Sequence, residues 1–320
     1  METRSKQGSV RRLEFDVDWP PGHVACYLIE GSEPILVDAA LPDHEAAFRS
    51  QLAELGYEPG DIEHVLVTHP HVDHIGLVPT VLEEGDPTVY APASVEERFN
   101  RDPDGLEARV RENCTEAGFP DEQLEMAVDM AVESLERNRE LLPPTAVDVW
   151  IEPGDRTEIG DIEVDAVHVP GHQADHLSYP TELDGESVLL GGDMGIQPFR
   201  PVVMHDGLDD GHVEAFDAFY TALDRLAELD VDRVYPGHGA VHTDLTGAVE
   251  RDRGSLDNRL ERVTDLVADG YTTVPGVAMA IAGDRDVKYL IPETMSALAH
   301  LDATGELDSE LRDGVRYYEP

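Results

Sequence analysis

The order of apolar and polar residues predicts short strands alternating with longer helices, a pattern typical of a mixed α/β protein. Two apolar runs, 24–29 and 35–37, predict a β-hairpin, because the residues between them favour a turn: Gly31, Ser32, Glu33 and Pro34. A helix from Asp43 to about position 55, with Asp43 as its N-cap, and a buried strand at 65–67 should follow. Further strands are predicted at 88–90, 147–151, 162–169, 177–179, 187–190 and 231–235.

Residues 93–142 differ from their surroundings, because they are rich in Glu, Arg, Leu and Met at helical spacing. One stripe of this segment contains Leu124, Val128, Ala131 and Leu135. Two or three helices are expected, separated by Pro103, Pro120, Pro143 and Pro144. Met126 and Met130 lie four residues apart, and their spacing predicts a place in the helical core.

Helical spacing returns at 213–228, where an apolar face is predicted for Val213, Phe216, Tyr220, Leu223 and Ala227, with Phe219 and Leu226 at its edge. From about 246 the pattern is helical again and closes with a predicted hairpin at 305–318. Single hydrophobic cores stop growing near about 250–300 residues. We therefore expect a main domain at 13–245 and a smaller, mostly helical domain at 246–320.

The chain is strongly acidic for a folded protein. Its 320 residues include 68 Asp and Glu against 23 Lys and Arg, a formal net charge of −45, and the only lysines are Lys6 and Lys288. Hydrophobic residues make up 41%, which excludes disorder as the reason for the charge. Nucleic acids and anionic membranes prefer basic surfaces, so both are disfavoured as partners. The charge favours a halophilic protein that works in concentrated salt, where repulsion between carboxylates is screened.

The sequence pattern also bears on the compartment. The first twelve residues are polar and show no signal-peptide core, and the longest apolar run, 276–283, is far shorter than the ~18 residues of a membrane span. Cys26 and Cys114 predict a reducing compartment without a disulfide framework. We therefore expect a cytoplasmic protein.

Histidine and aspartate residues gather where predicted strands end. Four segments show this pattern: His69-Pro70-His71-Val72-Asp73-His74, Pro170-Gly171-His172, Gly192-Asp193 and Pro236-Gly237-His238. Loops at strand ends are where a rigid sheet presents functional groups. These four segments are therefore the candidate functional site.

The first of these segments carries enough ligands for two neighbouring metal ions. His69 and His71 are two residues apart, so their rings should lie on the same side of an extended segment, whereas Asp73 and His74 point elsewhere. Imidazole and carboxylate ligands suit zinc, manganese or iron. The carboxylate of Asp193 could bridge a pair of ions about 3.5–4 Å apart, as in two-metal hydrolases.

Over about 22–240 the chain resembles the metallo-β-lactamase superfamily. The family motif His-x-His-x-Asp-His matches His69, His71, Asp73 and His74; the later ligands match His172, Asp193 and His238; and an early aspartate matches Asp38. The resemblance implies an α/β (α+β) fold, an αββα sandwich with the metals at one edge between two mixed sheets. It also implies that residues 93–142 are a helical insertion in this fold. Residues 246–320 resemble the small winged-helix-like domain of some members.

The resemblance also implies a role for each residue. His69, His71 and His172 would hold one divalent ion, Asp73, His74 and His238 a second, and Asp193 both. We expect zinc, with manganese or iron as alternatives. A bridging hydroxide would be the nucleophile, Asp73 would be the catalytic residue that orients it or takes up its proton, and Asp38 would accept a hydrogen bond from a ligating imidazole.

Three residues near these ligands are candidates for the substrate pocket. His176 and Tyr179 follow His172 closely, and His176 could donate a proton to the leaving group. His205 lies in a predicted loop and is a candidate substrate contact. The insertion at 93–142 directly follows the first ligand segment and the next strand, which suggests a lid over the metals.

Hydrolysis of a small molecule, foremost a thioester or another ester or lactone, is the predicted chemistry. The sequence leaves two alternatives: a mononuclear-iron oxidoreductase resembling persulfide dioxygenases, and an endoribonuclease or phosphodiesterase of the same superfamily. A true β-lactamase is disfavoured by the missing export signal and by Asp193. Residues 246–320 hold 15 acidic and 8 basic residues, which disfavours nucleic acid, so we expect a structural role or a homodimer interface.

Overall fold

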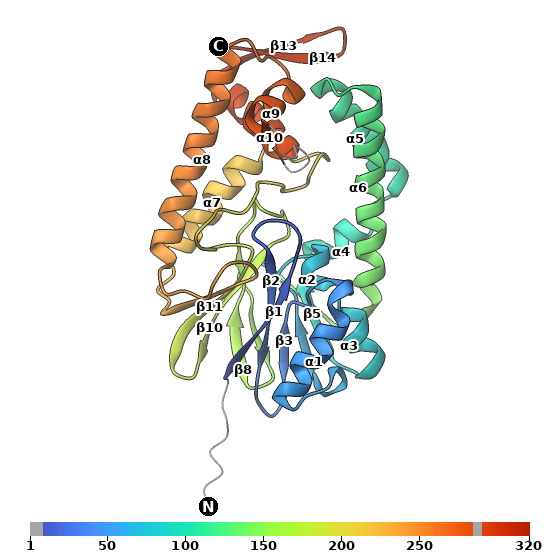
Figure 1. The fold of residues 1–320 in the computed structure, drawn as a ribbon, viewed down its shortest axis with the longest axis vertical. Coiled ribbons are helices and arrows are strands. Elements are labelled where there is room, and N and C mark those ends of the chain that lie inside the picture. Colours follow the sequence, from blue (N-terminus) through green and yellow to red (C-terminus); the bar gives the residue numbers. More distant parts are fainter. Residues whose placement is uncertain (1–8, 284–289) are drawn as a thin grey trace, which may run out of the picture.

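The computed structural model describes residues 9–283 and 290–320 and contains two mixed sheets of six strands each (Figure 1). The first sheet contains, in spatial order, β1 (Val10–Asp16), β2 (His23–Ile29), β3 (Ile35–Val37), β4 (His64–Leu66), β5 (Thr88–Pro92) and β6 (Val149–Ile151). The second contains β12 (Arg233–Pro236), β11 (Glu186–Gly192), β10 (Leu177–Leu183), β8 (Ile162–Asp165) and β7 (Arg156–Ile159), with β9 (Val167–His168) beside β10.

Helices cover the outer faces of both sheets and extend the molecule beyond the strand ends (Figure 1). Those that follow strands of the first sheet are α1 (Glu45–Leu55), α2 (Val72–Ile75), α3 (Val78–Glu84), α4 (Ser94–Phe99), α5 (Pro103–Ala117) and α6 (Asp121–Leu141). The later ones are α7 (Ala215–Ala227), α8 (Leu245–Ala268), α9 (Val274–Ala282) and α10 (Leu290–Thr304). None of the helices among the described residues is both long and apolar enough to cross a membrane.

The continuous apolar run of β2 follows from burial on both faces. Val24, Cys26 and Leu28 join the cluster that contains the buried residues of α1. The alternate residues Ala25, Tyr27 and Ile29 join a second cluster, shared with β10 and β11, that fills the space between the sheets. A strand with helices on one side and a sheet on the other has no polar face.

Most predicted elements are confirmed. β2 and β3 pair as an antiparallel hairpin, and residues 93–142 form α4, α5 and α6, with Pro103 in the first turn of α5 and Pro120 at the N-cap of α6. Asp43 was wrong as an N-cap, because it lies inside a short 3-10 turn and α1 begins only at Glu45.

Some apolar predictions are wrong, because helical spacing indicates neither the width of the buried stripe nor the residue at which the helix begins. The side chains of Met126 and Met130 are 58% and 38% exposed, on the solvent side of the buried stripe of α6. Val213 is 44% exposed, because α7 begins only at Ala215. Phe219, expected at the edge of the α7 face, is fully buried.

The C-terminal segment consists of α8, α9, α10 and a hairpin of β13 (Asp308–Arg312) and β14 (Val315–Glu319). α10 packs on α7, α8 and α9, and β14 packs on α5 and α8. Arg316 of the hairpin forms an ion pair with Glu116 of α5. The helical insertion and the C-terminal helices are thus joined beyond the strand ends, while the boundary at 245/246 stays a prediction.

Candidate metal centre

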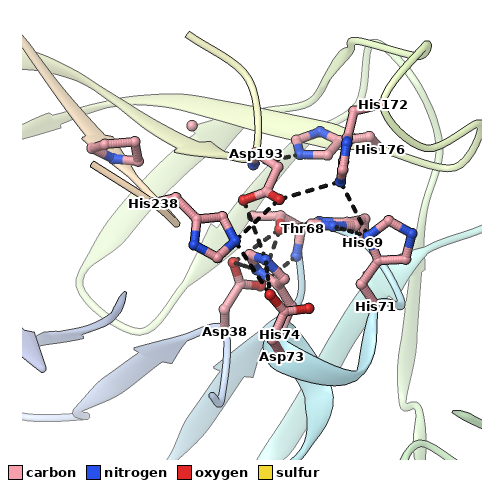
Figure 2. A network of polar contacts seen from close by, with 12 residues as sticks. Asp38, Thr68, His69, His71, Asp73, His74, His172, His176, Asp193 and His238 are labelled. Carbon is pink, nitrogen blue, oxygen red and sulfur yellow. Dashed lines mark hydrogen bonds and ion pairs between the residues drawn. The ribbon is translucent and has the colours of Figure 1, made fainter. Parts of the chain in front are cut away.

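The candidate ligands meet where strands of both sheets end (Figure 2). β4 leads into the extended residues His69 and His71, and the single turn of α2 carries Asp73 and His74. The three later residues each follow a strand of the second sheet: His172 after β9, Asp193 after β11 and His238 after β12. Residues from four separate parts of the sequence are thus brought to one end of the sandwich.

Their ligand atoms form three overlapping groups, each within 4.8 Å: His69, His71 and His172; His69, His74 and Asp193; and Asp73, His74 and His238. In the first group, His71 Nδ1 lies 3.0 Å from His69 Nε2 and 3.1 Å from His172 Nε2. Nitrogens bound tetrahedrally to zinc at about 2.0–2.1 Å would lie roughly 3.3 Å apart. The spacing of these nitrogens therefore fits a metal ion.

Four of the imidazoles use their other ring nitrogen to contact an acceptor outside the cluster. Nδ1 lies 2.9 Å from Val202 O in His172, 2.8 Å from His23 O in His238, 2.9 Å from Asp38 Oδ2 in His74, and 3.0 Å from Thr68 Oγ1 in His69. When Nδ1–H donates to that acceptor, the inward Nε2 presents a lone pair, and this tautomer is the one that metal-bound imidazoles adopt.

Thr68 belongs to the candidate site although its sequence position gave no reason to select it. Its hydroxyl donates to Asp38 Oδ2 at 2.9 Å and accepts from His69 Nδ1 at 3.0 Å. Asp38 thereby orients His74 directly and His69 through Thr68, and it also accepts the backbone N–H of Thr68 at 2.9 Å. The buried carboxylate of Asp38 thus fixes two imidazole rings that lie at least 30 residues later in the sequence.

The electrostatics of the cluster favour a bound cation. Burial and neighbouring imidazoles hold the pKa of His69 well below its usual value and lower that of His71 to about 3. Burial would also lower the pKa of His74 and His238, but Asp193 and nearby carboxylates outweigh it and raise that of His238 to about 10. The buried atoms His74 Nε2 and Asp193 Oδ1 lie 3.2 Å apart, but neither forms a well-aligned hydrogen bond with any described residue. Divalent cations would satisfy these atoms.

Two of the predicted pocket residues lie beneath the cluster instead, and these predictions are wrong. His176 is fully buried, stacks on His69 with ring centroids 4.6 Å apart, and accepts the backbone N–H of Asp193 at Nε2, 2.9 Å away. Tyr179 is also fully buried and donates its hydroxyl to Val67 O. Tyr179 lies on β10 and belongs to the cluster between the sheets, whereas His176 directly precedes β10. Both side chains support the candidate ligands from within the protein.

His205 contacts the ligand loop through its backbone. Its N–H lies 2.9 Å from the carbonyl oxygen of His172, and the ring is largely buried. This bond ties the loop at 201–206 to His172. Substrate contact by the His205 ring stays a prediction.

A network of largely buried ion pairs connects the helical insertion to the loops that contain His172 and His205. Arg98 of α4 forms ion pairs with Asp175 and Asp206 and donates to Gln173 Oε1 at 3.1 Å. Arg109 of α5 donates to Asp209 Oδ1 at 2.6 Å. These bonds hold the first part of the insertion against the loop that carries His172 and against the segment that contains Asp206 and Asp209. A lid formed by 93–142 stays a prediction.

Replacing Arg98 by alanine should lower the free energy of unfolding by about 3–5 kcal/mol, because the buried Asp175 then loses its charge partner. Arg111→Ala is a matched control, since Arg111 forms exposed pairs with Glu107 and Glu125, and exposed pairs contribute little to stability because solvent screens them. Denaturant unfolding measures both. Equal, small losses in the two variants would show that the network does not hold the loop.

Comparison with known proteins identifies the family. A family model described as the metallo-beta-lactamase superfamily matches residues 19–238. The chain is 24% identical over 315 residues to the probable metallo-hydrolase YqjP of Bacillus subtilis (strain 168), covering 93% of each chain. It is 23% identical to the atrochrysone carboxyl ACP thioesterase dmxR1 of Cryptosporiopsis sp. (strain 8999), covering 88% of this chain and 67% of that one.

A solved structure extends the likeness to the whole fold. A metallo-beta-lactamase family protein from Thermus thermophilus has a TM-score of 0.81 and 26% identity, covering 97% of this chain and 98% of that chain. The αββα sandwich expected from the sequence is thereby confirmed. Since the family model covers well over half of its length, the chain belongs to the metallo-β-lactamase superfamily and is a hydrolase.

Proposed function

We propose that the chain hydrolyses a thioester, or another ester or lactone, of a small molecule with two divalent metal ions, foremost zinc. The position of Asp193 carries this proposal. Asp193 Oδ1 lies 3.2 Å from His74 Nε2, and Oδ2 lies 3.2 Å from His172 Nε2. One carboxylate thus faces both halves of the cluster, as the shared ligand of a two-metal site does.

The remaining ligands divide between the two ions. In this proposal, one ion is held by His69, His71 and His172, and the other by Asp73, His74 and His238. The first group consists of three imidazoles, whereas the second includes a carboxylate, Asp73 Oδ2, at 3.2 Å from His238 Nε2. Both groups offer the nitrogen and oxygen donors that zinc accepts.

The chemistry follows from this arrangement. Two bound divalent ions would lower the pKa of water towards about 7 and polarise the carbonyl oxygen of the substrate. Burial alone would raise the pKa of Asp73, but His74 and His238 outweigh it and lower that pKa to about 2. An ionised Asp73 accepts hydrogen bonds, and its side chain is 12% exposed against 6% for Asp193. We therefore assign to Asp73 the orientation of the attacking water.

The choice of substrate class rests on two further observations. A relative that matches most of this chain is named an ACP thioesterase, which supports an acyl thioester. The net charge of −45 disfavours a polyanionic substrate such as RNA. Cytoplasmic location and a homodimer stay predictions.

A substrate panel tests the proposal. Wild-type protein in high salt is offered an acyl thioester, a lactone and a phosphodiester, with His69→Ala as the inactive control. We expect turnover of the thioester or the lactone by the wild type and none by the variant. Turnover of the phosphodiester alone, or oxygen consumption with a persulfide, would contradict the proposal.

Replacing Gly237 by alanine should reduce the metal content although no ligand is removed. A Cβ atom at this position would lie 2.6 Å from His74 Cε1 and 2.7 Å from Asp193 Oδ1, so both side chains must move. Gly254→Ala on α8 is the control, because its Cβ would meet nothing within 4 Å. Elemental analysis after gel filtration measures the metal per chain. Equal metal content in the two variants would place the ions away from His74 and Asp193.

A further inference from the structure

A buried carboxylate of the C-terminal helices lies within reach of the loop behind the candidate metal centre. Glu293, in the first turn of α10, is 1% exposed. Its Oε2 accepts the backbone N–H of Val203 at 3.0 Å, and its Oε1 lies 2.9 Å from Arg200 and 2.8 Å from Arg259. The carboxylate is therefore fixed by three donors.

The group bonded to Glu293 belongs to the same peptide that supports His172. The peptide between Val202 and Val203 donates its N–H to Glu293, and its carbonyl lies 2.9 Å from His172 Nδ1. A carboxylate that accepts from the N–H of an amide makes the carbonyl of that amide a stronger acceptor, because hydrogen bonds in a chain polarise one another. Glu293, this peptide and His172 form such a chain.

The charge on Glu293 is maintained by its surroundings. Burial alone would raise the pKa of Glu293, but Arg200 and Arg259 outweigh it and hold that pKa below its usual value. The carboxylate is therefore ionised at neutral pH, when it polarises the peptide most strongly.

We propose that Glu293 is a positioning residue through which the C-terminal helices set the orientation and donor strength of His172. This inference rests on the proposed metal centre. It gives the C-terminal segment a role at the metal site without contact with substrate. Mutating a residue that directly orients a metal-bound imidazole typically weakens metal affinity by 10–100-fold. Glu293 is one hydrogen bond further from the imidazole, because the peptide between Val202 and Val203 lies between them. We expect about a tenfold weakening of the ion held by His172, with little change at the ion held by His74 and His238.

Zinc binding by three variants tests this. Glu293→Gln keeps an oxygen for the Val203 N–H but removes the charge, and Glu293→Ala removes both. Ser296→Ala is the control, since Ser296 is fully buried on the same helix and its hydroxyl has no hydrogen-bond partner among the described residues. Chelator competition gives the two zinc dissociation constants of each protein, and circular dichroism gives its melting temperature.

The proposal predicts that Glu293→Gln weakens one zinc about tenfold, that Glu293→Ala weakens the same zinc at least as much, and that Ser296→Ala weakens neither. Two unchanged dissociation constants, or equal weakening of both that follows the melting temperature, would overturn it. A wild type that binds zinc but hydrolyses no ester would defeat the proposed function while leaving this test intact.

A readout on the metal-free protein needs neither zinc nor activity and serves if Glu293→Ala does not fold. The Nδ1–H proton of His172 should exchange with solvent several-fold faster in Glu293→Gln than in wild type, as measured by NMR of ¹⁵N-labelled imidazoles. His238 is the internal reference, because its Nδ1 contacts the backbone carbonyl of His23 instead. Unchanged exchange at His172, or equal acceleration at both rings, would overturn the proposal.

Discussion

Asp193→Ala should abolish hydrolysis and leave the purified protein with less than one metal ion per chain. Among the candidate ligands, Asp193 is the carboxylate that lies 3.2 Å from both His74 and His172. Without its negative charge between them, two bound cations would repel each other. Losing about 4 kcal/mol of transition-state stabilisation, a modest share of what two metals supply, already lowers the rate by about a thousandfold.

Two further variants make that result specific. Asp193→Asn keeps the shape and one oxygen, so it should fold like the wild type yet lose the second ion and most of the activity. Asp224→Ala removes an aspartate on α7 whose side chain is 73% exposed, and it should behave like the wild type. Undiminished activity or two retained metals in Asp193→Ala would show that the carboxylate is not shared.

Dialysis into low salt should unfold the protein. Two like unit charges 10 Å apart in water repel by about 0.4 kcal/mol. With a surplus of 45 negative charges, many such pairwise repulsions add up in the folded protein. Raising the ionic strength to 1 M shortens the screening length to about 3 Å and removes most of this repulsion. We therefore expect the melting temperature to rise steeply between 0.05 M and 2 M KCl.

The control for this effect is an uncharged osmolyte at matched osmolality, which stabilises without screening charge. It should replace only a small part of the effect of KCl. A melting temperature that is the same in 0.05 M and 2 M KCl would contradict the halophilic interpretation of the composition, without affecting the metal centre.

Much of the fold could be predicted because local patterns determine it. The run at 24–29 is apolar on both faces of a strand, and prolines mark the starts of α5 and α6. β1 and β7 were missed because strands at the edges of sheets carry charged residues such as Arg11 and Arg156, which hide the alternation.

The residues of the candidate site could be predicted from the sequence, but the residues that support them could not. His69, His71, Asp73 and His74 are neighbours in sequence, so their spacing alone indicates a shared purpose. Arg98 contacts a loop more than 70 residues away, and Glu293 one 90 residues away. In a chain with 68 acidic residues, nothing local indicates which carboxylate pairs with which arginine. The sequence also does not indicate how deeply a side chain is buried, so the fully buried His176 and Tyr179 resemble pocket residues because they follow His172 closely.

Elemental analysis of purified wild-type protein, kept in high salt throughout, decides whether the centre binds two metal ions. We expect about two zinc ions per chain, or two manganese or iron ions that zinc can replace, and loss of thioester hydrolysis when a chelator removes them. About one iron per chain, together with oxygen uptake on a persulfide, would contradict it.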